Sequence, residues 1–302
     1  MLLLHQRAIM MTNKIKVLQA ARHALSQRYK TEHQTKDLSP AERHVYIQAR
    51  MPATQAVCAN ILASHLGSRA DLNSLLDLGC GPGSATAAAL QVLPNLQTIH
   101  LIDQDDGYPY NFVQHTHFMR QDFKQLSLPQ SYDLTIISYA LSECSESLLI
   151  AVLEQAWANT EKYLVLIEPG TPYGYASFML ARQHLINQGA KIIAPCPHEN
   201  ICPLSQGDWC HFKLRLARSK LHQQIKQGSQ AFEDESYTFG IFSKSIVEQR
   251  HKRIIKKPMH KTGHMIFDLC TTIGLERIIV SRKNKTNYQR AKKLDWGDNL
   301  DL

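Results

Sequence analysis

The sequence of 302 residues contains no long hydrophobic run. No segment approaches the roughly 20 apolar residues that a membrane-spanning helix needs, so we expect no membrane partner. Met1–Leu4 is too short for the hydrophobic core of a secretion signal, and no small-residue cleavage site follows it. Residues 1–31 also lack acidic side chains, as organelle transit peptides do, but they carry a helical pattern. We therefore expect a cytoplasmic protein.

The cysteines do not form the pattern of a disulfide framework. There are seven of them, an odd number, and no secretion signal accompanies them. Internal repeats and low-complexity tracts are also missing. Hydrophobic residues make up 44% of the chain, which is ordinary for a globular protein, and the length suffices for one large α/β domain with an appended module.

Net positive charge is absent from the first two thirds of the chain, where acidic residues slightly outnumber basic ones, and it is concentrated in the last third. Residues 211–302 contain 19 Lys or Arg against 9 Asp or Glu, although the net charge of the whole chain is only +8. A local surplus of this kind suits contact with phosphate groups, and it also occurs on solvated surfaces that bind nothing.

Short hydrophobic runs alternate with helical patterns from residue 72 onward, which is typical of a parallel sheet with crossover helices. Strands are predicted at 74–78, 98–102, 132–139 and 163–167, and helices at 84–92, 145–158 and 176–188. Residues 14–67 have helical spacing, with Ser39 predicted as an N-cap ahead of Pro40. Two further strands are predicted at 265–269 and 277–281.

A glycine-rich turn follows the first predicted strand. Residues 75–84 read LLDLGCGPGS and lead directly into an alanine-rich helix. Gly79, Gly81 and Gly83 allow a ligand to approach the backbone, and the following helix N-terminus offers free N–H groups to it. This spacing is not the Gly-x-Gly-x-x-Gly of dinucleotide enzymes. With Asp77 before it, the stretch resembles motif I of class I S-adenosylmethionine-dependent methyltransferases, in which the matching acid lies near the methionine end of the cofactor.

Three further residues complete the predicted cofactor site. Asp103 ends the second strand about 20 residues after the turn, where an acid can accept hydrogen bonds from ribose hydroxyls. Asp122 and Phe123 follow the third strand position, where they suit the amine and the ring of an adenine. The sequence assigns no catalytic residue, because residues 138–143 (SYALSE) lack the Asn or Asp, Pro-Pro and aromatic pattern of amine methylation. Cys144 also lacks the Pro-Cys or Thr-Cys setting of carbon-5 methylation.

A second group of chemistry-bearing residues lies in a proline-containing loop. Cys196, Cys202 and Cys210 fall within fifteen residues, and Cys270 follows about 60 residues later. Four thiolates can hold either a tetrahedral zinc ion or a cubane iron–sulfur cluster. The gaps of five and seven residues are wider than those of zinc knuckles and favour a cluster, while His198 and His211 leave a mixed Cys/His zinc site open.

The motif I turn followed by this cysteine loop resembles the methyltransferase-like family associated with the small ribosomal subunit, which has bacterial and mitochondrial members. The resemblance spans residues 40–300 and rests on phrases at 50–54, 77–83, 138–143, 168–171, 196–198, 202–203, 208–212, 233–235 and 268–270. It implies a Rossmann-like α/β core and a C-terminal module stapled by a 4Fe–4S cluster on Cys196, Cys202, Cys210 and Cys270. It also implies binding to small-subunit rRNA during assembly.

We accordingly expect an N-terminal helical segment at 1–70, an S-adenosylmethionine-binding domain at 71–193 and a cysteine-loop and basic module at 194–302. Basic residues that could neutralise rRNA phosphates are Lys252, Arg253, Lys256, Lys257, Lys261, Arg282, Lys283, Lys285, Arg290, Lys292 and Lys293. Tyr288 and Trp296 lie among them and suit packing more than base stacking.

Three functions fit these features. The first is an S-adenosylmethionine-dependent RNA methyltransferase that acts on the small ribosomal subunit. The second is a non-catalytic rRNA-binding assembly factor that keeps the fold, and the lack of a familiar acceptor motif favours it. The third is a small-molecule or protein methyltransferase with a zinc staple, which the basic C-terminal region disfavours.

Overall fold

The computed structural model describes residues 2–32, 38–110, 112, 115–204, 207–246 and 250–301. The chain divides into two compact units. The first comprises Met1–Gln125 and Leu214–Glu235, and the second comprises Leu126–Lys213 and Ser236–Leu302. No helix in the described ranges has both the length and the hydrophobicity to cross a membrane.

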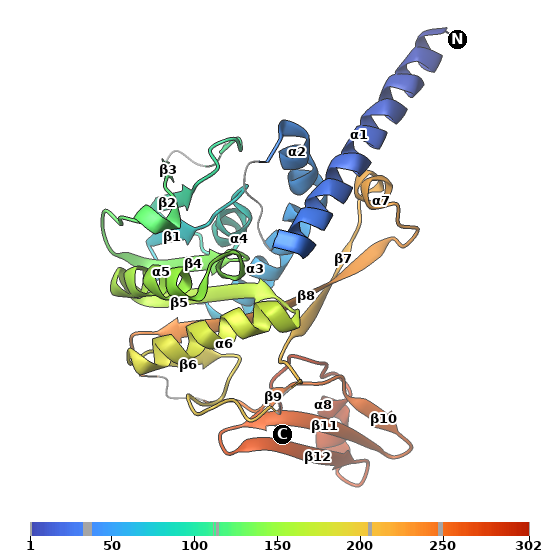
Figure 1. Ribbon diagram of the computed structural model, residues 1–302. Coiled ribbons are helices and arrows are strands. Elements are labelled where there is room, and N and C mark those ends of the chain that lie inside the picture. The colour runs from blue at the N-terminus through green and yellow to red at the C-terminus, as the bar shows by residue number, and fades with distance from the viewer. Residues whose placement is uncertain are drawn as a thin grey trace. The chain divides into compact units, whose positions relative to one another are not determined.

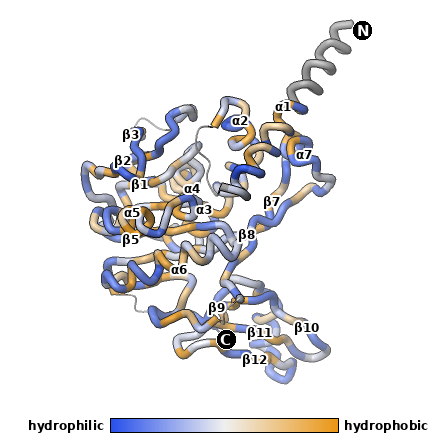
Figure 2. Tube along the Cα trace, in the orientation of Figure 1, coloured by the Kyte–Doolittle hydropathy of each residue, from blue (hydrophilic) through white to orange (hydrophobic). Residues whose placement is uncertain are grey.

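Helices open the first unit, as the sequence predicts (Figure 1). They are α1 (Leu2–Glu32), α2 (Pro40–Ala49) and α3 (Met51–His65). The predicted N-cap is confirmed, because the Ser39 side chain accepts a hydrogen bond from the Glu42 N–H in a capping box. The later helix α7 (Lys220–Lys226) packs on α1 and α2 around buried Leu18, Val45 and Ile225, and hydrophobic residues occur on all these helices (Figure 2).

The first unit also holds three parallel strands in the order β3-β2-β1. They are β1 (Ser74–Leu78), β2 (Thr98–Asp103) and β3 (Thr116–Arg120), with α4 (Ser84–Val92) between the first two and the short helix η1 (Phe123–Gln125) after the third. Strand β1 and helix α4 fall on their predicted residues. Because four of the five residues of β1 are buried, the strand holds the start of the glycine turn in a fixed position.

The second unit continues the α/β pattern with β4 (Tyr132–Ser138) parallel to β5 (Thr160–Pro169). The helices are η2 (Leu141–Glu143), α5 (Glu146–Ala158) and α6 (Pro172–Asn187). The sequence did not predict the two antiparallel strands that follow. Strand β8 (Phe232–Ser243) pairs with β5, and β6 (Lys191–Ala194) pairs with β8. Strand β7 (Phe212–Ala217) also pairs with β8. The strands of this unit therefore combine parallel and antiparallel pairs.

The C-terminal part of the second unit has its own small antiparallel sheet (Figure 1). Its strands are β9 (Arg253–Ile254), β10 (Met259–Lys261), β11 (His264–Thr271) and β12 (Gly274–Ser281), followed by α8 (Lys285–Ala291). The two strands predicted here are confirmed as β11 and β12. Alternate residues of β11 point into a core that contains Met265, Phe267 and Leu269, as expected of a sheet with one covered face.

Candidate functional site

The glycine turn between β1 and α4 adopts a backbone that favours glycine. Gly81 and Gly83 have φ angles of +50° and +82°, in the left-handed region. A Cβ atom at Gly81 would meet no atom within 4 Å, so the space beside that residue is open. The hydroxyl of Thr54 on α3 donates to Ser84, the first residue of α4, at 2.9 Å. The N-terminal helices therefore help to hold the turn.

Asp77 lies immediately before the turn and is completely buried. Its Oδ2 accepts hydrogen bonds from the Thr86 N–H at 3.0 Å and from the Thr86 hydroxyl at 2.6 Å. Its Oδ1 is buried with no hydrogen-bond partner. Burial raises the pKa of Asp77 to about 6, against the lowering effect of the Thr86 hydrogen bonds. A buried acceptor oxygen without a donor suits a cationic or N–H-bearing ligand group.

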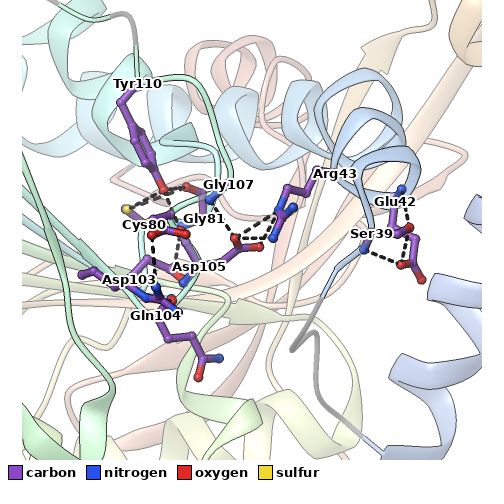
Figure 3. A network of polar contacts seen from close by, with 12 residues as sticks. Ser39, Glu42, Arg43, Cys80, Gly81, Asp103, Gln104, Asp105, Gly107 and Tyr110 are labelled. Atoms are coloured by element: carbon purple, nitrogen blue, oxygen red, sulfur yellow. Dashed lines mark hydrogen bonds and ion pairs between the residues drawn. The ribbon is translucent and has the colours of Figure 1, made fainter.

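Asp103 ends β2 and turns back toward the glycines (Figure 3). Its Oδ2 accepts from the Gly81 N–H and its Oδ1 from the Asp105 N–H, both at 2.8 Å. Burial raises the pKa of Asp103, and these backbone donors oppose the rise. The carboxylate thus shapes the turn directly, a role that its position at the strand end did not reveal.

The loop after β2 lies against the same turn. The Tyr110 hydroxyl donates to the Gly81 carbonyl at 2.8 Å, and the ring of Phe112 occupies the space that a Cβ at Gly83 would need. On its other side, the loop is tied to α2, where Arg43 forms an ion pair with Asp105 at 2.7 Å (Figure 3). These contacts cover part of the turn with side chains of the protein itself.

Asp122 and Phe123 lie directly after β3, as the sequence predicts. Both are half-buried, and the Asp122 Oδ1 accepts from the Lys124 N–H at 3.0 Å at the start of η1. The structure therefore places Asp77, Gly79, Gly81, Gly83, Asp103, Asp122 and Phe123 in one unit, at or just beyond the carboxyl ends of three parallel strands. This is where open α/β sheets bind their ligands.

The four predicted metal ligands share one pocket of the second unit. Cys196, Cys202, Cys210 and Cys270 all line it. Cys270 comes from β11, whereas the other three belong to the loop between β6 and β7, so the tertiary fold brings together thiols that are far apart in sequence. Within the described ranges, no group of three His, Cys, Asp or Glu side chains is placed to hold a metal ion.

Two buried arginines accompany the thiols. Arg253 lines the pocket, and Arg182 on α6 is wholly buried beside it. Burial raises the pKa of the Cys196 thiol, while Arg182 and Arg253 oppose that rise. The two guanidinium groups therefore lie where they can offset negative charge on these thiols. Arg253 was predicted to contact rRNA phosphates, and that prediction is wrong because only 8% of the residue is exposed.

The two histidines of the cysteine loop have different surroundings. The His198 Nε2 lies 3.6 Å from the Cys270 sulfur, and the ring is largely buried. His211 instead stacks on Trp209 and contacts the edge of Trp296. Burial lowers the pKa of both imidazoles. His198 thus lies beside a predicted ligand, whereas His211 belongs to an aromatic cluster.

Glu168 belongs to one of the segments that carry the family resemblance. It is completely buried at the end of β5, and its oxygens accept from the N–H groups of Leu141 and Ser142 at 2.9 and 3.2 Å. Burial raises its pKa to about 7. The following Gly170 carbonyl accepts from the Trp209 indole at 3.0 Å, so the cysteine loop is tied to the end of β5.

The remaining basic residues of the C-terminal region differ in how far they are neutralised. Lys256 pairs with Asp208 at 3.0 Å and Lys252 with Glu276 at 3.3 Å. Several others are exposed, among them Lys257, Lys261, Arg282, Lys283, Lys285, Arg290, Lys292 and Lys293. Tyr288 is 9% exposed, so it packs in the core of this module and is not presented for base stacking.

The sequence matches the Rsm22 family, described as mitochondrial small ribosomal subunit Rsm22, over residues 40–301. The chain belongs to this family. It is 26% identical to Rsm22-cox11 tandem protein 2, mitochondrial, of Schizosaccharomyces pombe, across 91% of this chain and 45% of that protein. It is also 26% identical to the human mitochondrial ribosome assembly protein METTL17, across 75% of this chain and 55% of that protein.

Two of the solved structures with a similar fold are methyltransferases. The plantazolicin methyltransferase BpumL with S-adenosylhomocysteine has a TM-score of 0.45 and 18% identity, and covers 78% of this chain and 100% of its own. The magnesium protoporphyrin IX methyltransferase of Synechocystis has a TM-score of 0.42 and 14% identity, and covers 72% of this chain and 93% of its own.

The chain spans about half the length of the curated relatives it matches. The prediction of a cytoplasmic protein is wrong, because the family description and the names of these Rsm22 and METTL17 relatives place them in mitochondria.

Proposed function

We propose that this Rsm22-family chain is an S-adenosylmethionine-binding, methyltransferase-like factor that acts on the small ribosomal subunit through its rRNA. The observation that carries the cofactor assignment is Asp77, whose buried Oδ1 has no hydrogen-bond partner at the entry to a glycine turn with open space beside Gly81. The ribosomal assignment draws on the family match and on the relatives named as ribosome assembly proteins.

In this proposal the cofactor supplies the reactive methyl group, and the protein supplies binding and orientation. Asp77 orients the methionine end, the glycines admit the ligand to the backbone, and Asp103 takes the ribose. Asp122 and Phe123 receive the adenine. We propose the boundaries 1–70, 71–193 and 194–302 for the helical, cofactor-binding and basic modules.

We further propose that Cys196, Cys202, Cys210 and Cys270 hold a 4Fe–4S cluster, with zinc as the alternative occupant. Their convergence on one pocket and the two neighbouring arginines support this assignment. Such a group would join the loop after β6 to strand β11, so its main contribution would be to the folding of the C-terminal module.

A specific observation favours a second function, a non-catalytic rRNA-binding assembly factor. Tyr110 and Phe112 lie against Gly81 and Gly83, on the backbone that a cofactor would approach. With this arrangement, cofactor must displace the loop after β2 before any transfer. A protein that does not catalyse methyl transfer would not need to move this loop.

The deciding experiment is methyl transfer from radiolabelled S-adenosylmethionine to small ribosomal subunits and their assembly intermediates, with protein purified without oxygen. Label in rRNA that is lost with Asp77→Ala and kept with Asp106→Ala would establish an RNA methyltransferase. Asp106 is a suitable control because it is an exposed carboxylate that pairs with Arg120. Binding to the particles without any label would establish the assembly factor.

A further inference from the structure

Arg182 on α6 is among the largest completely buried side chains of the described protein. A guanidinium is charged at all ordinary pH values, and taking it out of water costs several kcal/mol unless a counter-charge or hydrogen bonds compensate. Arg182 makes no ion pair with a carboxylate among the described residues. Its burial therefore needs another explanation.

Backbone carbonyls of the cysteine loop compensate part of the cost of burying Arg182. The Arg182 Nη2 donates to the carbonyl oxygens of His198 and Asn200, both at 2.9 Å, and so holds the backbone between Cys196 and Cys202. The Nε and Nη1 atoms are also buried, and within the described ranges neither has a well-aligned partner, although a side-chain hydrogen bond from Arg182 lowers the pKa of the Cys196 thiol. Unused donors on a buried cation are rare, because each one costs free energy.

The surroundings of Arg182 indicate what these donors face. Its charge acts on the thiols of Cys196 and Cys270, which belong to different elements. Arg253 acts on Cys196 and Cys210 in the same way. Glu199, the acid nearest in the loop sequence, is already paired with Arg250 at 2.6 Å.

We propose that Arg182 is a positioning residue of the cysteine site, and that its Nε and Nη1 donate hydrogen bonds to the sulfur atoms of the group held there. This inference rests on the proposed 4Fe–4S cluster. Four thiolates around a cluster core in its oxidised form leave a double negative charge in a buried place. Arg182 and Arg253 together balance that charge, which explains why both are buried.

In this role Arg182 affects the reduction potential of the cluster, which a residue with a purely structural role would not do. Hydrogen bonds and positive charge next to cluster sulfur stabilise the reduced form, and so raise the reduction potential. Arg182→Gln removes the charge and the paired donors, and should shift the potential to a more negative value. Arg182→Lys keeps the charge but not the fork of donors, so it should give a smaller shift in the same direction.

The matched control is Arg250→Gln. Arg250 also braces the cysteine loop, through Glu199 and the Ile192 carbonyl at 2.8 Å, but its nitrogens are engaged by these oxygens. The Arg250→Gln substitution should lower the thermal stability of the module without changing the reduction potential of the cluster. The measurement is a redox titration of the full chain, purified without oxygen and followed by the electron paramagnetic resonance signal of the reduced cluster, with iron content determined on the same samples.

The outcomes separate the two proposals. A wild-type protein that contains no iron would overturn the cluster and this inference with it. If the wild-type protein contains a cluster and both Arg182 variants have the same reduction potential as wild type, only the role of Arg182 is overturned. If Arg182→Gln does not fold, the Arg182→Lys titration decides, and a potential equal to that of wild type would refute the inference.

Discussion

The Tyr110 hydroxyl donates to the Gly81 carbonyl at 2.8 Å, and this bond joins the loop after β2 to the proposed cofactor turn. The sulfur of Cys80 lies 3.8 Å from the same hydroxyl. Because the opposite side of the loop is tied to α2 through Arg43 and Asp105, the N-terminal helices and the cofactor turn share one polar network (Figure 3).

The first prediction concerns this bond. Tyr110→Phe removes the hydroxyl and should loosen the loop over the turn, so that S-adenosylmethionine binds more tightly. A net hydrogen bond contributes about 1 kcal/mol, which corresponds to an increase in affinity of roughly fivefold. Isothermal titration calorimetry measures the affinity for S-adenosylmethionine, with Tyr288→Phe in the C-terminal module as the control. Weaker binding in Tyr110→Phe would mean that the hydroxyl supports the bound state.

The second prediction concerns Glu168, whose pKa burial raises to about 7 from an ordinary 4.5. Between these pH values the folded protein keeps a proton that the unfolded chain releases, so Glu168 lowers the free energy of unfolding as pH rises from about 4.5 to 7. Glu168→Gln should remove this contribution, on the order of 1–3 kcal/mol.

Denaturant unfolding of wild type and Glu168→Gln across that pH range provides the measurement. The control is Glu161→Gln, an exposed position on the same strand. If the difference in unfolding free energy between wild type and Glu168→Gln does not change with pH, Glu168 is ionised throughout in the folded protein.

The third prediction concerns the cysteine pocket. Cys202→Ser should lose bound iron and lower the melting temperature of the protein, because metal binding in such sites is coupled to folding. The control is Cys144→Ser, a half-buried thiol near the Ala140 carbonyl that does not line the pocket. Iron content and calorimetry are measured on protein prepared without oxygen. A Cys202→Ser protein of full stability and unchanged iron content would refute the ligand assignment.

The fourth prediction concerns the exposed lysines of the C-terminal module. Binding to small-subunit rRNA should weaken steeply with salt, and replacing Lys283, Lys285 and Lys293 with Ala should reduce the slope of log affinity against log salt. Each phosphate contact that is lost should lower the slope by about 1. Arg277→Ala is the control, since Arg277 is already paired with Asp268 at 2.6 Å. An affinity that does not depend on salt would exclude a phosphate-binding role for these residues.

Local physical chemistry allowed much of this structure to be predicted from the sequence. Strand β1, the glycine turn and helix α4 depend on neighbouring residues, because a hydrophobic strand, three glycines and an alanine-rich segment each favour one backbone conformation. The same holds for the Ser39 cap of α2. The placement of the proposed cofactor-site residues follows from these elements, since the ends of parallel strands meet at one edge of a sheet.

The tertiary structure decided what depends on contacts between distant segments. Strand β8 pairs antiparallel to β5, about 70 residues earlier in the chain, and no local pattern specifies that partner. Arg253 lies in a basic stretch of sequence that suggests phosphate binding, but the fold buries it beside the thiols. Arg182 gave no signal in the sequence, because its role depends on the His198 and Asn200 carbonyls and on the thiols that the fold brings around it. Burial and pairing are properties of the fold, and the linear pattern of residues does not contain them.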